Sequence, residues 1–260
     1  MDSFTLSFIF VLGLAIGSFL NVVIDRLPKG KSIIRGRSYC DFCRHTLAWY
    51  DLIPVLSFIV LGRKCHYCQK SISWQYPIVE FITAILFIII FASINRFIDV
   101  SSYLTILIFH LVVISGLIVI FFTDLKYRII PDQIVLVLTV VTLFYHLLNR
   151  SHVWSNYLLS GLIMSAFLLM LLLITRGRGM GLGDVKFAFL MGLILGFPSI
   201  IIAFYLSFLT GALFSLILIL SGKKTIKATI PFGPFLAVAT IVSLFYGQSL
   251  WRLFKGILGI

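Results

Sequence analysis

The chain has few charged residues for its 260-residue length: Asp, Glu, Lys and Arg together make up only 12% of it. Soluble globular domains carry about 25%. Hydrophobic residues account for 60% and the mean hydropathy is +1.11, which excludes an ordinary soluble domain. The short segments of alternating hydrophobicity that are typical of membrane β-barrels are also lacking. These absences leave a helical integral membrane protein, in which each segment satisfies its own backbone hydrogen bonds.

Apolar stretches long enough to cross a bilayer, roughly 17–25 residues each, recur along nearly the whole chain. They predict an all-α, polytopic membrane protein with about eight transmembrane helices. The expected helices cover residues 4–24, 77–94, 102–122, 131–148, 156–175, 185–197, 199–221 and 232–250. The first has no basic region before it and no small-residue cleavage site after it, so we interpret it as a retained helix rather than a signal peptide.

The net charge of +12 could suggest a nucleic-acid partner, but Lys and Arg do not form a stripe with interleaved aromatic residues. Most of them gather in alternate loops, at residues 25–76, 123–130, 176–186 and 222–231. Basic loops stay on the cytoplasmic side of a membrane. We therefore expect a membrane protein with both termini outside, the lipid bilayer as a partner and no nucleic acid.

All four cysteines lie in the long loop 25–76, which connects the first two predicted helices. They form two C-x-x-C knuckles: Cys40, Cys43, Cys65 and Cys68. Four thiolates in two such knuckles are typical of a tetrahedral structural zinc site, whose metal supplies folding free energy to a loop with little apolar core. The expected cytoplasmic location disfavours disulfides. Reduced or redox-active cysteines are the alternative interpretation.

Only nine residues are acidic, and four of them lie at or inside the predicted membrane boundary: Glu80, Asp124, Asp132 and Asp184. Ionisable groups in this position are costly and usually functional. Asp124 follows the helix expected over residues 102–122. Asp184 follows Gly181 and Gly183 at the start of the short helix expected over residues 185–197. Both aspartates are expected at the cytoplasmic face.

Each carboxylate also has an ordinary structural interpretation. Asp124 could be solvated at the interface and paired with Lys126 or Arg128, and Asp184 could be the N-cap of a glycine-rich turn. Asp132 follows Pro131 in an arrangement that is common at helix N-termini. The functional interpretation of Asp124 and Asp184 depends on their meeting, because two close carboxylates share one proton and can activate water against a peptide carbonyl.

Eight segments closely resemble the type IV prepilin peptidase family, over nearly the full chain. They are residues 17–28 (GSFLNVVIDRLP), the two C-x-x-C knuckles, 51–57 (DLIPVLS), 76–80 (YPIVE), 124–132 (DLKYRIIPD), 181–186 (GLGDVK) and 231–235 (PFGPF). The resemblance implies that Asp124 and Asp184 are the catalytic pair of a G-x-G-D aspartic protease, with Gly181 and Gly183 in the catalytic loop.

The resemblance also implies a substrate and a second activity. The substrates would be prepilins or pseudopilins, which lose a short basic leader, and the new N-terminus would be methylated with S-adenosylmethionine. The expected organisation is a first helix over 1–24, a zinc-binding, methyltransferase-associated domain over 25–76 and a peptidase domain over 77–260. No G-x-G-x-x-G follows a predicted strand, so the residues that bind the methyl donor stay unassigned.

Glu80 could bind a substrate ammonium group, or it could simply be a helix-start carboxylate favoured by the dipole. A proton- or cation-coupled transporter that uses Asp124 and Asp184 is the alternative function, but the related halves that many transporter folds contain are not seen. A noncatalytic membrane adaptor with a zinc loop is a further alternative.

Overall fold

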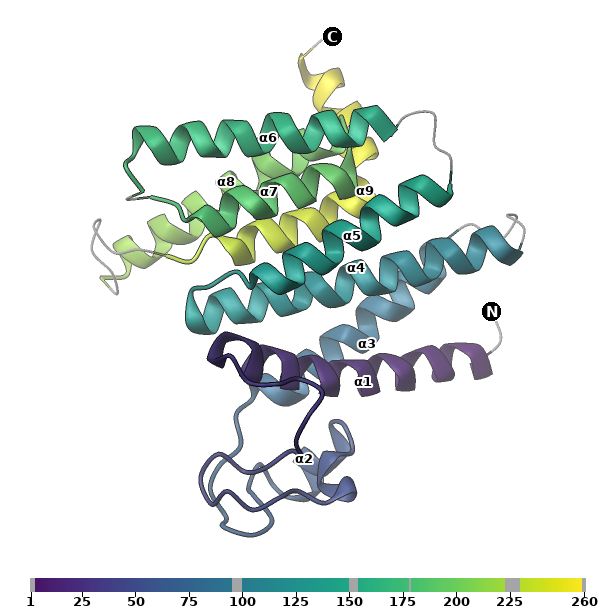
Figure 1. The fold of residues 1–260 in the computed structure, drawn as a ribbon, viewed down its shortest axis with the longest axis vertical. Coiled ribbons are helices and arrows are strands. Elements are labelled where there is room, and N and C mark those ends of the chain that lie inside the picture. Colours follow the sequence, from purple (N-terminus) through teal and green to yellow (C-terminus); the bar gives the residue numbers. More distant parts are fainter. Residues whose placement is uncertain (1–2, 95–99, 150–153, 178, 223–229, 259–260) are drawn as a thin grey trace. The chain divides into compact units, whose positions relative to one another are not determined.

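The computed structural model describes residues 3–94, 100–149, 154–177, 179–222 and 230–258, and Figure 1 shows their arrangement. Several basic residues of the predicted cytoplasmic loops lie outside these ranges: Arg178, Lys223, Lys224 and Lys227. The described residues are largely helical and form no strand; their only β-type pairs are two isolated bridges in the loop 25–76.

Every predicted helix is present. The long helices are α1 (Ser3–Arg26), α3 (Gln75–Ser93), α4 (Val100–Tyr127), α5 (Asp132–Leu148), α6 (Trp154–Ile174), α7 (Leu182–Leu195), α8 (Ser199–Leu220) and α9 (Gly233–Leu258). The long loop adds three short elements that were not predicted: η1 (Leu27–Lys29), η2 (Trp49–Leu52) and α2 (Leu56–Val60). Elements of three to five residues are too short to show a helical period.

The helix α4 continues past its predicted end at residue 122, so that Asp124 lies within its last turn rather than beyond it. The helix stops where Arg128 adopts a left-handed conformation (φ 57°) and donates its N–H to the Asp124 carbonyl at 2.9 Å. Pro131, three residues later, prevents the helix from continuing because it has no N–H to donate. The chain therefore turns sharply between α4 and α5.

The length and composition of the described helices identify a multi-pass membrane protein. Six of them are long and apolar enough to cross a membrane, namely α1, α3, α4, α6, α8 and α9. The other two are shorter, with 17 residues in α5 and 14 in α7. The total of eight spans stays a prediction.

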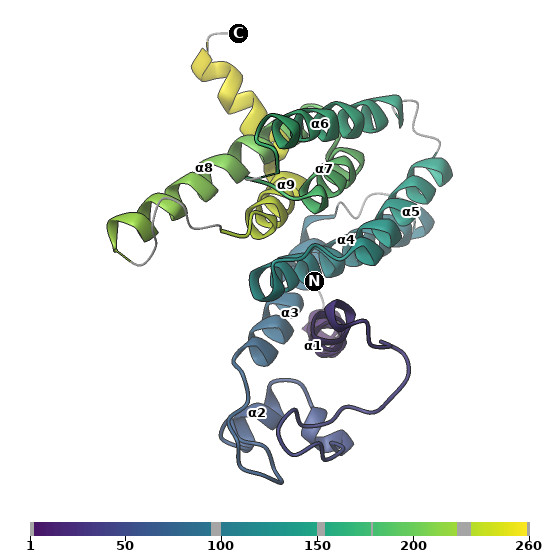
Figure 2. The same ribbon diagram turned by 60° about the vertical axis from the view of Figure 1, so that its left-hand side comes forward.

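The chain divides into two compact units, Met1–Val119 and Ile120–Ile260. In the first unit α1 packs along α3, and the two lie side by side in Figures 1 and 2. Their backbones approach closely where Gly17 faces Glu80: a Cβ on Gly17 would lie 2.6 Å from the Glu80 Cα. Such close approach through small residues is a common way for membrane helices to associate.

Polar contacts at one end of this helix pair hold the two ends of the loop 25–76 together. The Asn21 amide donates to the Tyr76 carbonyl at 3.0 Å, and the Tyr76 hydroxyl donates to Asp25 Oδ2 at 2.8 Å. These bonds join the last turns of α1 to the first turn of α3. The loop is therefore a compact insertion that begins and ends at one place.

In the second unit α7 is the central helix, contacted by α5, α6, α8 and α9. Its side chains from Phe187 onward are mostly buried, which explains why the helix is apolar on all sides. The closest packing is against α6, where Gly192 faces Gly161 and a Cβ on either backbone would overlap the other. Because neighbouring helices contact α7 on several sides, its first turn is held in a fixed position. This turn contains Asp184.

Candidate active site and metal centre

Asp124 lies in the last turn of α4 and is almost fully buried, with 6% of its surface exposed. Its Oδ2 accepts a hydrogen bond from the backbone N–H of Gly233, the first residue of α9, at 2.9 Å. A Cβ at position 233 would lie only 2.7 Å from the same oxygen. A glycine at this position therefore lets the backbone come within hydrogen-bond distance of the carboxylate.

Asp184 is the third residue of α7 and is also buried, with 8% exposed. Its Oδ2 accepts the N–H of Gly181 at 2.9 Å, so that the side chain closes back on the turn before the helix. A carboxylate in the first turn of a helix is stabilised by the unsatisfied N–H groups and the helix dipole. The glycine-rich turn thus fixes Asp184 through purely local contacts.

Two contacts bring the start of α7 to the turn between α4 and α5. The Gly181 N–H holds Asp184 at the start of α7, on the side of that turn. A Cβ on Gly183 would lie 3.2 Å from the Ile130 Cβ, and Lys186 Nζ forms a 2.8 Å ion pair with Asp132 Oδ2. The end of α4 and the starts of α5, α7 and α9 therefore lie close together.

This arrangement fixes one oxygen of each carboxylate to a backbone N–H and leaves the other oxygen for chemistry. Among the described residues, neither Asp124 Oδ1 nor Asp184 Oδ1 accepts a hydrogen bond from the protein. The hydroxyl of Thr123, which is fully buried next to Asp124, likewise has no hydrogen-bond partner in the described part of the chain. Two carboxylates with oriented, unoccupied oxygens are suited to polarising a carbonyl and activating a water molecule.

The sequence alone did not assign a role to Gly233. Position 233 lies 109 residues from Asp124 and contributes only a backbone N–H, which no side-chain pattern reveals. The PFGPF segment at residues 231–235 was the available signal. Its glycine between two prolines marks a backbone that must both turn and approach another group.

The four cysteines converge as predicted, in the loop 25–76 of the first unit. Their Sγ atoms all lie within 4.8 Å of one another, and those of Cys40 and Cys68 are 3.8 Å apart. Four thiolates at about 2.3 Å from one tetrahedral zinc would be about 3.8 Å apart. The cluster can therefore hold a metal ion such as zinc.

The two knuckles have the same backbone conformation, a local repeat that the sequence did not reveal beyond its cysteines. In the first, Arg44 N–H donates to the Cys40 carbonyl at 2.9 Å, with Arg44 in a left-handed conformation (φ 61°). In the second, Gln69 N–H donates to the Cys65 carbonyl at 3.0 Å, with φ 58° at Gln69. Each knuckle is closed by one of the two isolated bridges. These turns aim both thiols of each knuckle at one point.

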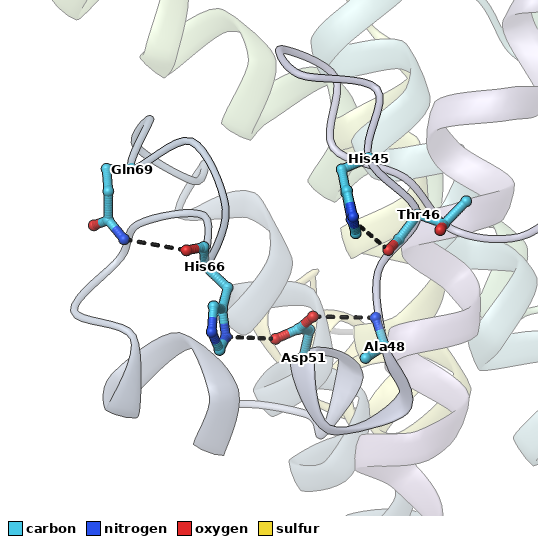
Figure 3. A network of polar contacts seen from close by, with 6 residues as sticks. All are labelled: His45, Thr46, Ala48, Asp51, His66 and Gln69. Atoms are coloured by element: carbon cyan, nitrogen blue, oxygen red, sulfur yellow. Dashed lines mark hydrogen bonds and ion pairs between the residues drawn. The ribbon is translucent and has the colours of Figure 1, made fainter.

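Side chains around the knuckles connect them to the rest of the loop (Figure 3). Asp51, whose side chain is 2% exposed, accepts the N–H of Ala48 at 3.1 Å and lies 3.3 Å from His66 Nδ1. The ring of His45, from the first knuckle, stacks on Tyr67, from the second, at 3.7 Å. Desolvation, followed by the neighbouring Tyr50 and Asp51, raises the pKa of Tyr67 to about 12. Tyr67 therefore stays neutral and packs as an aromatic ring.

Glu80 lies in α3 and is largely buried in the first unit. Its Oε2 accepts the N–H of Val55 at 2.8 Å. Val55 has φ 60°, a conformation that is strained for a β-branched residue. Glu80 therefore fixes the inserted loop to α3 at its most strained position. Binding of a substrate ammonium by Glu80 stays a prediction.

The helices, the carboxylate pair and the thiolate cluster together define a multi-pass membrane protein with features of an aspartic protease and a metal-binding insertion. Two family models match the chain: the bacterial peptidase A24 N-terminal domain over residues 11–94 and the type IV leader peptidase family over residues 111–216. The chain belongs to the type IV leader peptidase family.

Curated relatives cover nearly the whole chain. The prepilin leader peptidase/N-methyltransferase of Bacillus subtilis (strain 168) is 35% identical over 245 residues, which are 94% of this chain and 96% of the relative. The protein of the same name from Aeromonas salmonicida (strain A449) is 31% identical over 275 residues, covering 95% and 92%. One from Myxococcus xanthus (strain DK1622) is 47% identical over 124 residues, covering 48% and 35%. No solved structure gives a significant match.

Proposed function

We propose that this protein is a membrane-embedded aspartic endopeptidase that removes the short basic leader from type IV prepilins or pseudopilins. The observation that carries the proposal is that the end of α4 and the start of α7, which bear Asp124 and Asp184, lie close together, with each aspartate held by a glycine N–H. The family and the names of the relatives support the same activity.

In the proposed reaction the two carboxylates share one proton, because like charges that are close together do not both ionise. The ionised member of Asp124 and Asp184 takes a proton from water, which attacks the scissile carbonyl. The protonated member donates a hydrogen bond to the carbonyl oxygen and then helps the new amine to leave. The bonds from Gly233 and Gly181 keep one oxygen of each carboxylate fixed, so that the remaining oxygens act.

We place the reaction at the cytoplasmic face of the bacterial plasma membrane, with both termini outside. The support is the concentration of Lys and Arg in alternate loops. A basic leader stays on this same side of the membrane, and the apolar segment of the pilin lies in the bilayer. The scissile peptide bond would then lie at the depth of the two aspartates.

We also propose that the new N-terminus is methylated with S-adenosylmethionine, which supplies the methyl group when bound. The loop 25–76 would be the associated domain, with Cys40, Cys43, Cys65 and Cys68 holding a structural zinc ion, and residues 77–260 would form the peptidase domain. The support is the name of the relatives and the fit of the four thiols to tetrahedral zinc. Glu80 would help by fixing this loop to α3.

The decisive experiment replaces Asp184 with Asn and co-expresses the variant with a pilin precursor. Asp132→Asn is the matched control, because it also removes one carboxylate near the start of α7, but from an exposed ion pair. Mass spectrometry of the pilin then reports both leader loss and the methyl group. We expect no cleavage with Asp184→Asn and cleavage within a few-fold of the wild type with Asp132→Asn. Normal pilin processing in the presence of Asp184→Asn would exclude the protease. If the protein is a transporter or an adaptor, the replacement leaves pilin processing unchanged.

A further inference from the structure

A basic cavity of about 550 Å³ lies in the first unit, where α1 ends and the loop 25–76 begins. Its lining includes five cationic side chains, Arg26, Lys31, Arg35, Arg37 and Arg44, together with Tyr39. No carboxylate lines it. The proposed peptidase pair and the thiolate cluster use none of these side chains; only the backbone of Tyr39 and Arg44 takes part in closing the first knuckle.

The cavity is a folded feature rather than a run of solvated charges. The Arg26 guanidinium donates hydrogen bonds to the carbonyls of Ser32 and Arg35, both at 3.2 Å, and to that of Arg37 at 3.0 Å. Because these bonds wrap the loop around Arg26, its charge becomes part of the cavity wall. The loop is tightened further by the Arg35 N–H, which donates to Ser32 Oγ at 3.0 Å.

The rim of the cavity is also held in place. Lys31 Nζ donates to the Tyr39 hydroxyl at 3.0 Å. Arg35, Arg37 and Arg44 are exposed, so their guanidinium groups are accessible to a ligand. A guanidinium binds phosphate oxygens through paired N–H groups, so several arginines around one cavity suit a phosphate ligand.

The position of the cavity limits which phosphate it can meet. The apolar span that contains α1 extends to Lys29, so that Arg26 and the loop after it lie at the end of a membrane helix. Lipid headgroups lie at this depth, and basic residues next to a membrane helix attract anionic lipids. A basic pilin leader would instead be repelled by the five cations.

We propose that this cavity is a binding site for a phosphate group, occupied by the headgroup of an anionic phospholipid. The bound headgroup neutralises part of the charge around Arg26 and ties the inserted loop to the membrane surface. This proposal is independent of the peptidase, because its test measures lipid binding rather than cleavage.

The test uses the purified full-length protein in detergent at physiological salt, which screens diffuse attraction to the surface. Native mass spectrometry follows the binding of phosphatidylglycerol, with phosphatidylcholine as the uncharged comparison. Arg35→Gln with Arg37→Gln removes two charges from the cavity, while Arg26, which holds the loop, is kept. Lys64→Gln with Lys70→Gln is the matched control, because it removes two exposed charges from the same loop outside the cavity.

We expect one phosphatidylglycerol to bind at least about tenfold more tightly than phosphatidylcholine, and the cavity variant to lose this preference while the control keeps it. Unchanged zinc content in the cavity variant would show that the loop is folded. An added arm with inorganic phosphate identifies the source: no competition supports the lipid, and competition supports a soluble phosphate compound in the same site. An equal loss in both variants, or no preference for phosphatidylglycerol together with no binding of phosphate, would overturn the proposal.

Discussion

The replacement of Gly233 by alanine tests the site most directly, because it changes one contact and preserves the hydrogen-bond donor. The new Cβ would lie 2.7 Å from Asp124 Oδ2 and 3.0 Å from its Cγ, whereas ordinary contact begins at 3.4 Å. The carboxylate must therefore move by about 0.7 Å. This movement lengthens the 2.9 Å bond from the position 233 N–H beyond hydrogen-bond range.

The expected loss is mainly in the chemical step, with a smaller cost to folding. A misplacement of this order at a catalytic group costs about 10- to 100-fold in rate, and the lost bond to a carboxylate is worth about 1.5–3 kcal/mol. The backbone of Gly233 does not have a positive φ, so alanine is compatible with the helix and restricts the unfolded chain. We expect kcat for leader cleavage to fall by about 10- to 100-fold, with KM nearly unchanged and the melting temperature lowered by only a few degrees.

Gly256→Ala is the control for this experiment, because Gly256 lies in the same helix, α9, and a Cβ there would meet nothing within 4 Å. The assay is cleavage of a purified pilin precursor in lipid, with thermal unfolding followed in parallel. Gly256→Ala should cleave at the wild-type rate. A Gly233→Ala variant with wild-type kcat would refute the reasoning that the position of Asp124 controls the reaction.

The other predictions concern the metal, the inserted loop and the glycine-rich turn. Elemental analysis should find about one zinc per chain, and Cys40→Ser with Cys65→Ser should remove it; retained zinc would contradict the site. Glu80→Leu leaves the Val55 N–H without its acceptor, at a cost of about 1–3 kcal/mol, so hydrogen exchange around Val55 should accelerate, whereas Glu80→Gln, which keeps an acceptor, should change it less. Gly181→Ala should cleave at nearly the wild-type rate, because its Cβ would be 3.8 Å from Asp184 Oδ2. The Cβ of Gly183→Ala would lie 3.2 Å from Ile130, so this variant should cleave more slowly. A kinetic assay in which Gly181→Ala is the slower variant would contradict this packing.

The sequence predicted the helices and the candidate pair because both leave signals in side-chain chemistry. Apolar length predicts a membrane helix, and an aspartate at a membrane boundary is costly enough to be noticed, as at Asp124 and Asp184. The two C-x-x-C knuckles predicted the convergence of four thiols for the same reason. In each case the signal is a rare residue type: an aspartate at a membrane boundary, or a pair of cysteines separated by two residues in a chain with only four.

Contacts made by the backbone left no such signal. Glu80 appeared as a helix-start carboxylate, and only the structure shows that it accepts the N–H of a strained Val55. Asp132 was interpreted as a helix N-terminal residue, which it is, but its ion pair with Lys186 joins residues 54 positions apart. Pairing between distant segments depends on how helices pack, and local sequence patterns do not encode packing.

The two carboxylates differ in what determines their positions. Asp184 is fixed by Gly181, three residues away, so its turn and α7 form one local unit. Asp124 is fixed by Gly233, 109 residues away, so its position depends on how α9 lies against the end of α4. The position of Asp124 therefore depends in part on α9, although the matched leader-peptidase region ends at residue 216. It follows that α9 is part of the candidate site, and that a peptide reaching both aspartates must fit beside the start of this helix.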